Sequence, residues 1–157
     1  MDILNLGAGN SPVKIGEGDR GVNHDVRLDP ARPWVTVAWD LNDLPWPWED
    51  NGFDVIVART VLEHLRLNLI ESMNECWRIL RKGGKALLKL PDYRHEHSFI
   101  DPTHYWRFSI HTVEVFDPET RYGRAYAFYT PRKWKIVKGP RLNRCRSSIY
   151  VTLEVRK

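Results

Sequence analysis

The chain has only two cysteines and no long apolar run. These features argue against a cysteine-based metal site and against a membrane-spanning helix. Its 157 residues include only two cysteines, Cys76 and Cys145, which lie far apart and lack the paired spacing of a metal site. No stretch approaches the roughly 18 apolar residues of a membrane-spanning helix, and the first residues do not follow the charged-then-apolar layout of a leader peptide. We therefore expect a single domain over residues 1–157, cytoplasmic and without membrane contact.

The chain is globular in composition, but its charge is uneven. Hydrophobic residues make up 42% and aromatic residues 11% of the chain, which argues against wholesale disorder. Residues 121–157 hold eleven Lys and Arg against one acidic residue, whereas the rest holds thirteen against nineteen. Such asymmetry fits an anionic partner such as nucleic acid, or simply a solvated strand face. We favour the solvated face, because the charges are scattered among apolar residues.

Short apolar runs and one helical pattern predict an α/β fold. Strands are expected at Ile3–Leu6, Gly21–Asp25, Trp34–Ala38, Phe53–Ala58 and Lys85–Leu90. A helix is expected at Leu69–Arg81, ended by Gly83-Gly84. This order favours a mostly parallel, Rossmann-like sheet. Two later runs, Lys133–Lys138 and Ser148–Val155, are expected to pair as C-terminal antiparallel strands around a Gly139-Pro140 turn.

Helices are expected to be few. The segments 11–20, 26–33 and 41–52 are short and rich in residues that favour turns, so full crossover helices do not fit in them. We expect loops or single turns instead. One face of the sheet would then be left for a second copy of the chain, as in a homo-oligomer, or for another partner.

Four motifs occur at the expected strand ends. The first strand leads into Gly7-Ala8-Gly9-Asn10, while Asp25 and Asp40 close the next two strands. After the fourth strand come Leu62-Glu63-His64 and then a helix ending in Arg78–Gly84. Over roughly the first 110 residues, this combination resembles the class I, Rossmann-like S-adenosylmethionine-dependent methyltransferases, of the type that acts on small molecules or glycans.

The resemblance implies a cofactor and the residues that bind it. In open α/β sheets, ligands bind beyond the carboxyl ends of the strands, where Asp25 would accept hydrogen bonds from the ribose hydroxyls. Asp40 and Leu41 lie where the family holds adenine. The remaining expected contacts with S-adenosylmethionine come from the glycine turn and from the end of the fourth strand: Gly7, Ala8, Gly9, Asn10, Arg59 and Thr60.

The segment after the fifth strand holds the candidate catalytic residues. His104 is expected to act as a base together with Asp101, because related sugar-type methyltransferases carry a similar Asp-x-x-His and imidazole titrates near neutral pH. A structural histidine bonded to a loop is the alternative. His95, His97, Asp101 and His104 are also the residue types that bind Zn²⁺. Loop histidines occur more often without metals, so we predict no metal.

Several other functions remain open or are disfavoured. The glycine turn lacks the third glycine of an NAD-binding fingerprint, which weakens a dehydrogenase. Ala58-Arg-Thr-Val61 stands where DNA amino-methyltransferases carry Asn/Asp-Pro-Pro-aromatic. We predict methyl transfer to an oxygen or nitrogen of a small-molecule or glycan acceptor. The alternatives are an inactive binding module with the same fold, and an RNA-directed protein using the basic residues 121–157.

Overall fold

The computed structural model describes residues 1–157, and one seven-stranded sheet organises it. The strands are β1 (Asp2–Leu6), β2 (Arg20–Asp25), β3 (Val37–Ala38), β4 (Phe53–Arg59), β5 (Leu80–Pro91), β6 (Lys133–Leu142) and β7 (Ser148–Arg156). Their order in the sheet is β3-β2-β1-β4-β5-β7-β6. The first five are parallel, and β7 is antiparallel to both of its neighbours. The predicted Rossmann-like sheet with a reversed C-terminal strand is confirmed.

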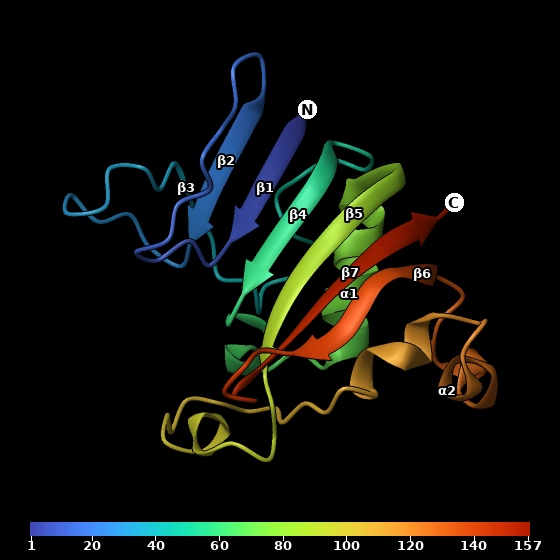
Figure 1. Ribbon diagram of the computed structural model, residues 1–157. Coiled ribbons are helices and arrows are strands. Elements are labelled where there is room, and N and C mark those ends of the chain that lie inside the picture. The colour runs from blue at the N-terminus through green and yellow to red at the C-terminus, as the bar shows by residue number, and fades with distance from the viewer.

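Helices are sparse, and the longest of them covers one face of the sheet. The α-helices are α1 (Leu69–Ile79) and α2 (Arg121–Ala125), and single 3-10 turns form η1 (Leu62–His64), η2 (Glu96–Ser98), η3 (Thr112–Phe116) and η4 (Ala127–Tyr129). Figure 1 shows α1 behind the sheet and no helix in front of β1, β4 and β5. The expected reduced set of helices is confirmed. No helix has the length and apolar character needed to cross a membrane.

Helix α1 begins at a capping box and ends earlier than its pattern predicts. The Asn68 side chain accepts a hydrogen bond from the Glu71 amide, and the Glu71 carboxylate accepts one from the Asn68 amide. The predicted end at Arg81 is wrong, since the helix stops at Ile79. The next residue, Leu80, is already extended and pairs with Phe53 of β4. Gly83-Gly84 therefore lies within β5 rather than ending the helix.

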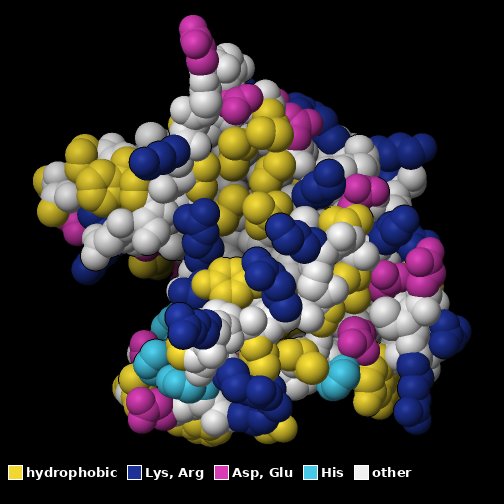
Figure 2. Space-filling model, in the orientation of Figure 1, with side chains coloured by type: hydrophobic (Ala, Val, Ile, Leu, Met, Phe, Trp, Pro, Cys, Tyr) yellow, Lys and Arg dark blue, Asp and Glu magenta, His cyan; other side chains and the backbone are white.

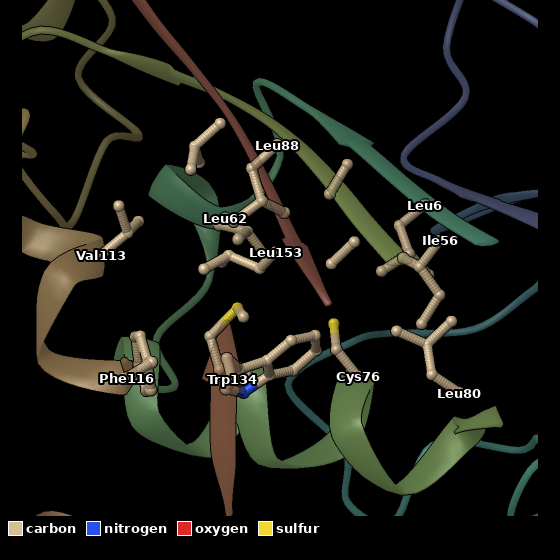
Figure 3. Close-up of a cluster of buried hydrophobic side chains, with 14 of the residues drawn as sticks. Leu6, Ile56, Leu62, Cys76, Leu80, Leu88, Val113, Phe116, Trp134 and Leu153 are labelled. Carbon is tan, nitrogen blue, oxygen red and sulfur yellow. The ribbon is translucent and has the colours of Figure 1, made fainter. Parts of the chain in front are cut away.

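The core lies between α1 and the sheet. Leu6 and Ile56 from the sheet, Cys76 from α1 and Trp134 from β6 are all buried in one cluster, and Figure 3 shows these side chains pointing into it. Burial raises the pKa of the Cys76 thiol to about 12, so this cysteine packs in the core and does not act as a nucleophile.

Two other strand predictions need correction. Only Val37–Ala38 of the expected Trp34–Ala38 strand pairs with β2. The start of the expected strand belongs to a turn, in which the Val35 amide donates a hydrogen bond to the Arg32 carbonyl. Gly139-Pro140 is not the turn between β6 and β7. It lies inside β6, where the pairing with β7 shifts register, and the connection falls at residues 143–147.

Buried polar side chains fix the loops that replace crossover helices. Two hydrogen bonds hold the loop after β1. The side-chain amide of Asn5 donates to the Ser11 carbonyl, and the backbone amide of Val13 donates to Asn23 Oδ1. Before β4, the guanidinium of Arg78 donates to the carbonyls of Trp46 and Trp48. These contacts position the strand ends without helices.

Candidate functional site

The turn after β1 needs glycine at its first position. Gly7 has a φ of +59°, and a Cβ there would lie 2.6 Å from Cγ2 of Val61. This combination of a left-handed backbone and close approach of a neighbouring side chain excludes other residues. The turn is secured from β2, because the Ala8 amide donates to the His24 carbonyl at 2.7 Å.

Asp25 at the end of β2 holds several groups together. Its Oδ2 accepts from the Gly9 amide at 2.8 Å and from the Arg32 guanidinium at 3.1 Å, and its Oδ1 accepts from the Val26 amide at 2.7 Å. The Trp34 indole donates to the Gly9 carbonyl at 3.0 Å. The carboxylate therefore faces the glycine turn in a fixed orientation.

A cavity of about 370 Å³ opens at these strand ends. This size is within the range of small-molecule sites. Five of the expected cofactor residues line it: Gly7, Asp25, Asp40, Leu41 and Thr60. Six further lining residues had no assigned role: His24, Val26, Asn42, Val61, His64 and Leu65. We call this the first cavity.

The floor of the first cavity is ordered by neutral and charged hydrogen bonds. Asp40 Oδ1 accepts from both the backbone and side-chain amides of Asn42, whose Oδ1 accepts from the Arg66 amide. His24 lies beneath with its Nε2 2.9 Å from the Trp39 carbonyl. Burial lowers the pKa of His24, so its imidazole is neutral at pH 7 and donates to that carbonyl.

The other expected cofactor residues lie outside the lining. Ala8, Gly9 and Asn10 form the turn that shapes the first cavity but are not part of its wall. Arg59 lines a separate hollow of about 250 Å³ on the open face of the sheet, together with Lys89, Lys138 and Arg141. It lies there because alternate residues of a strand face opposite sides of the sheet, and Val57 and Arg59 face away from α1.

A second cavity of about 310 Å³ adjoins the first and shares Thr60 and His64 with it. Thr60 has a φ of +50°, a left-handed conformation that is costly for a β-branched residue. Figure 2 shows the surface hollowed on this side of the molecule, with histidine side chains along one wall. The two cavities meet at a strained strand end, a common setting for a functional site.

The structure brings both expected catalytic residues to the second cavity. His104 is largely buried, its Nε2 lies 3.9 Å from Asp101 Oδ2, and its Nδ1 lies 3.4 Å from the Ser98 carbonyl. Asp101 Oδ1 accepts from the amide and hydroxyl of Thr103. These hydrogen bonds lower the pKa of Asp101, so its carboxylate is charged at neutral pH.

Two residues of the Leu62-Glu63-His64 motif complete this wall. Glu63 is fully buried, and neither carboxylate oxygen has a hydrogen-bond partner. Burial raises the pKa of Glu63 to about 7. His64 Nδ1 lies 2.8 Å from Thr103 Oγ1. The motif is visible in the sequence, but its pattern does not reveal that η1 turns Glu63 inward.

The four residues considered for a metal do not bring their donor atoms together, although His97, Asp101 and His104 all line the second cavity. The rings of His95 and His97 lie 4.3 Å apart, while His104 contacts His64 instead, with ring centroids 4.6 Å apart. The donor atoms that come within 4.8 Å of one another belong to Glu63, His64 and His104.

Residues of the basic C-terminal region lie on two separate parts of the surface, the open face of the sheet and the area beside α2. Lys138 and Arg141 of β6 and Tyr150 of β7 line the hollow on the open sheet face, where Figure 2 shows Lys and Arg gathered around apolar side chains. Tyr126 and Tyr129 stack on each other at 5.4 Å beside α2 and are exposed.

Comparison with known proteins agrees with this architecture. A family model described as a methyltransferase domain matches residues 21–88. No curated protein matches the chain.

Several solved structures share the fold at low sequence identity. One belongs to a complex between the Haloferax volcanii Trm112 methyltransferase activator and a methyltransferase, with TM-score 0.66, 14% identity and coverage of 99% of this chain and 83% of that one. Another, an S-adenosylmethionine-dependent methyltransferase from Archaeoglobus fulgidus, has TM-score 0.63, 14% identity and coverage of 99% and 86%. The methyltransferase CalH, in complex with S-adenosylhomocysteine, has TM-score 0.61, 16% identity and coverage of 98% and 51%.

The chain thus has the Rossmann-like fold of class I methyltransferases. The methyltransferase-domain match over residues 21–88 and the shared fold support S-adenosylmethionine as the cofactor.

Proposed function

We propose that the protein transfers a methyl group from S-adenosylmethionine to an oxygen or nitrogen of a small-molecule or glycan acceptor. The observation that carries this proposal is the junction of two cavities at Thr60 and His64. The first cavity would hold the cofactor and the second the acceptor. Methyl transfer is an in-line displacement, which needs two such sites side by side with a shared opening.

In this reading the first cavity binds the cofactor through strand-end residues. Asp25 accepts hydrogen bonds from the ribose hydroxyls, and Asp40 and Leu41 border the adenine. Gly7 leaves room for the methionine portion, and Ala8, Gly9 and Asn10 keep the turn in shape. Arg59, also expected at the cofactor, lines the hollow on the other face of the sheet.

His104 and Asp101 would act on the acceptor. The Ser98 carbonyl can only accept a hydrogen bond, so the hydrogen of neutral His104 lies on Nδ1 and its Nε2 lone pair is free. That nitrogen takes the proton from the acceptor as the oxygen or nitrogen bonds to the methyl carbon and the carbon–sulfur bond breaks. Asp101 stabilises the resulting imidazolium.

Calorimetric titration with S-adenosylmethionine, S-adenosylhomocysteine and NAD tests the cofactor. Micromolar binding of the first two without NAD supports the proposal, and absence of binding contradicts it. His104→Ala should lower turnover at least a hundredfold while leaving cofactor affinity within about twofold. Binding without turnover against any acceptor favours an inactive binding module.

A nucleic-acid substrate is the second candidate, favoured by the hollow on the open face. Arg59, Lys89, Lys138 and Arg141 surround it, and Tyr150 offers a ring for stacking. Affinity for single-stranded RNA that falls steeply with salt, and falls further in Arg141→Ala, supports this candidate. Salt-independent or absent binding contradicts it. A protein with a similar fold is complexed with the Trm112 activator, and pull-down with such an activator tests whether this chain also binds a protein partner.

A further inference from the structure

We propose that Glu63, His64 and His104 form a binding site for a divalent transition-metal ion of the zinc class. One donor atom from each side chain lies within 4.8 Å of those of the other two. Ligands around a tetrahedral zinc ion, bound at about 2.0–2.2 Å, lie roughly 3.5 Å apart. Small side-chain rotations therefore suffice to close the three donors on one ion.

Glu63 is the feature that points to a cation. Its side chain is fully buried, and both carboxylate oxygens lack a hydrogen-bond donor. Buried carboxylates are otherwise paired, hydrogen-bonded or metal-bound, because leaving one alone costs several kcal/mol. Lys89 lines the same cavity but donates no hydrogen bond to Glu63. A bound cation would supply the missing counter-charge.

Both histidines have a nitrogen free for an ion. The Thr103 hydroxyl donates to Asp101 Oδ1 at 2.7 Å, so Thr103 Oγ1 accepts from His64 Nδ1. His104 Nδ1 donates to the Ser98 carbonyl. In the neutral tautomer that these contacts select, Nε2 is the nitrogen without a hydrogen on both rings. Second-shell hydrogen bonds of this kind fix the ring orientation of metal-binding histidines.

The donor set selects the class of ion. Two imidazoles and one carboxylate suit zinc and neighbouring transition metals, whereas magnesium prefers oxygen ligands. A three-residue set leaves a coordination position open toward the second cavity. This part rests on the proposed function: an acceptor hydroxyl bound to the ion would lose its proton more readily. With the ion bound, His104 Nε2 would be a ligand, and the ion would replace it in the role of base described above.

Metal titration of chelator-treated, dialysed protein tests the site without measuring methylation. We expect one Zn²⁺ per chain, a visible absorption band with Co²⁺, and no binding of Mg²⁺. Glu63→Gln, which keeps the shape but removes the charge, should weaken Zn²⁺ binding at least tenfold. His104→Gln should do the same.

The control is the His95 and His97 pair, whose rings also lie close together. His97 lines the same cavity, but neither histidine belongs to the group of donor atoms around Glu63. The double variant His95→Gln/His97→Gln should retain Zn²⁺ affinity. Loss of affinity in this double variant, unchanged affinity in Glu63→Gln, or no binding to the wild type would each overturn the site. Circular dichroism of each variant reports folding, and S-adenosylmethionine titration of the same samples tests the proposed function separately.

Discussion

At the scale of single residues, Asp25 carries the most specific cofactor prediction. Asp25→Ala should weaken S-adenosylmethionine binding by more than about tenfold, or about 1.4 kcal/mol, because it removes charge-assisted hydrogen bonds and the anchor of the Gly9 amide. Calorimetry on the folded variant measures this. Asp43→Ala, an exposed acid outside the cavity, is the control. Unchanged affinity in Asp25→Ala would remove the ribose assignment.

Gly7 offers a second prediction at this scale, with a matched control in the same chain. Gly7→Ala should destabilise the protein by roughly 2–4 kcal/mol, since it combines left-handed strain with a clash against Val61. Gly18 also has a positive φ, of +80°, but no atom lies near its Cβ position. Gly18→Ala should therefore cost only about 1–2 kcal/mol. Equal losses in urea unfolding would show that the close contact with Val61 carries no cost.

At the scale of elements, the segment that carries His104 depends on an ion pair at the end of β5. Both oxygens of Asp92 accept from the Arg94 guanidinium at 3.0 Å, and Oδ1 also accepts from the Arg94 amide. These bonds hold the pKa of Asp92 below its ordinary value of 3.8. The stabilisation is therefore complete above about pH 4 and is lost as pH falls through the lower folded pKa.

Asp92→Asn should cost about 1–3 kcal/mol at pH 7 and should flatten the loss of stability as the pH falls below about 4. Urea unfolding at several pH values measures both effects. Asp43→Asn, which alters an exposed acid, should leave the profile unchanged. If Asp92→Asn loses stability at low pH as strongly as the wild type, that loss must come from other carboxylates.

The elements also show where sequence patterns are informative. Apolar runs located β1 and β4 to within one or two residues, because burial on a parallel sheet requires such runs. The bounds of β2 were predicted equally well, although its buried residues are Asn23 and His24. The helical pattern wrongly included Leu80, which pairs with Phe53 in the sheet. The turn predicted at Gly139 was also wrong, because this residue lies inside β6 although glycine usually favours turns. In the sequence, Glu63 stands out only as part of the Leu62-Glu63-His64 motif. Its burial depends on tertiary packing around η1, which local sequence does not encode.

At the scale of the whole molecule, the uneven charge has a structural counterpart. Lys138 and Arg141 of β6, the edge strand opposite β3, line one hollow with Arg59 and Lys89. The acidic residues Asp25 and Asp40 lie at the first cavity. The first cavity is therefore lined by acidic residues, and the hollow on the open face of the sheet is lined by basic ones.

Because the first cavity is built from β1, β2, β4 and their loops together, its ligand should stabilise the whole domain. S-adenosylmethionine at one hundred times its dissociation constant should add about 2.7 kcal/mol to the free energy of unfolding. For a domain of this size that corresponds to a rise in Tm of roughly 5–10 °C. Scanning fluorimetry measures the shift, with NAD as the control ligand. Asp25→Ala should show a much smaller rise at the same concentration, since its site is weakened while its fold remains. An equal rise with NAD, or an equal rise in Asp25→Ala, would mean that the stabilising ligand binds elsewhere than at the end of β2.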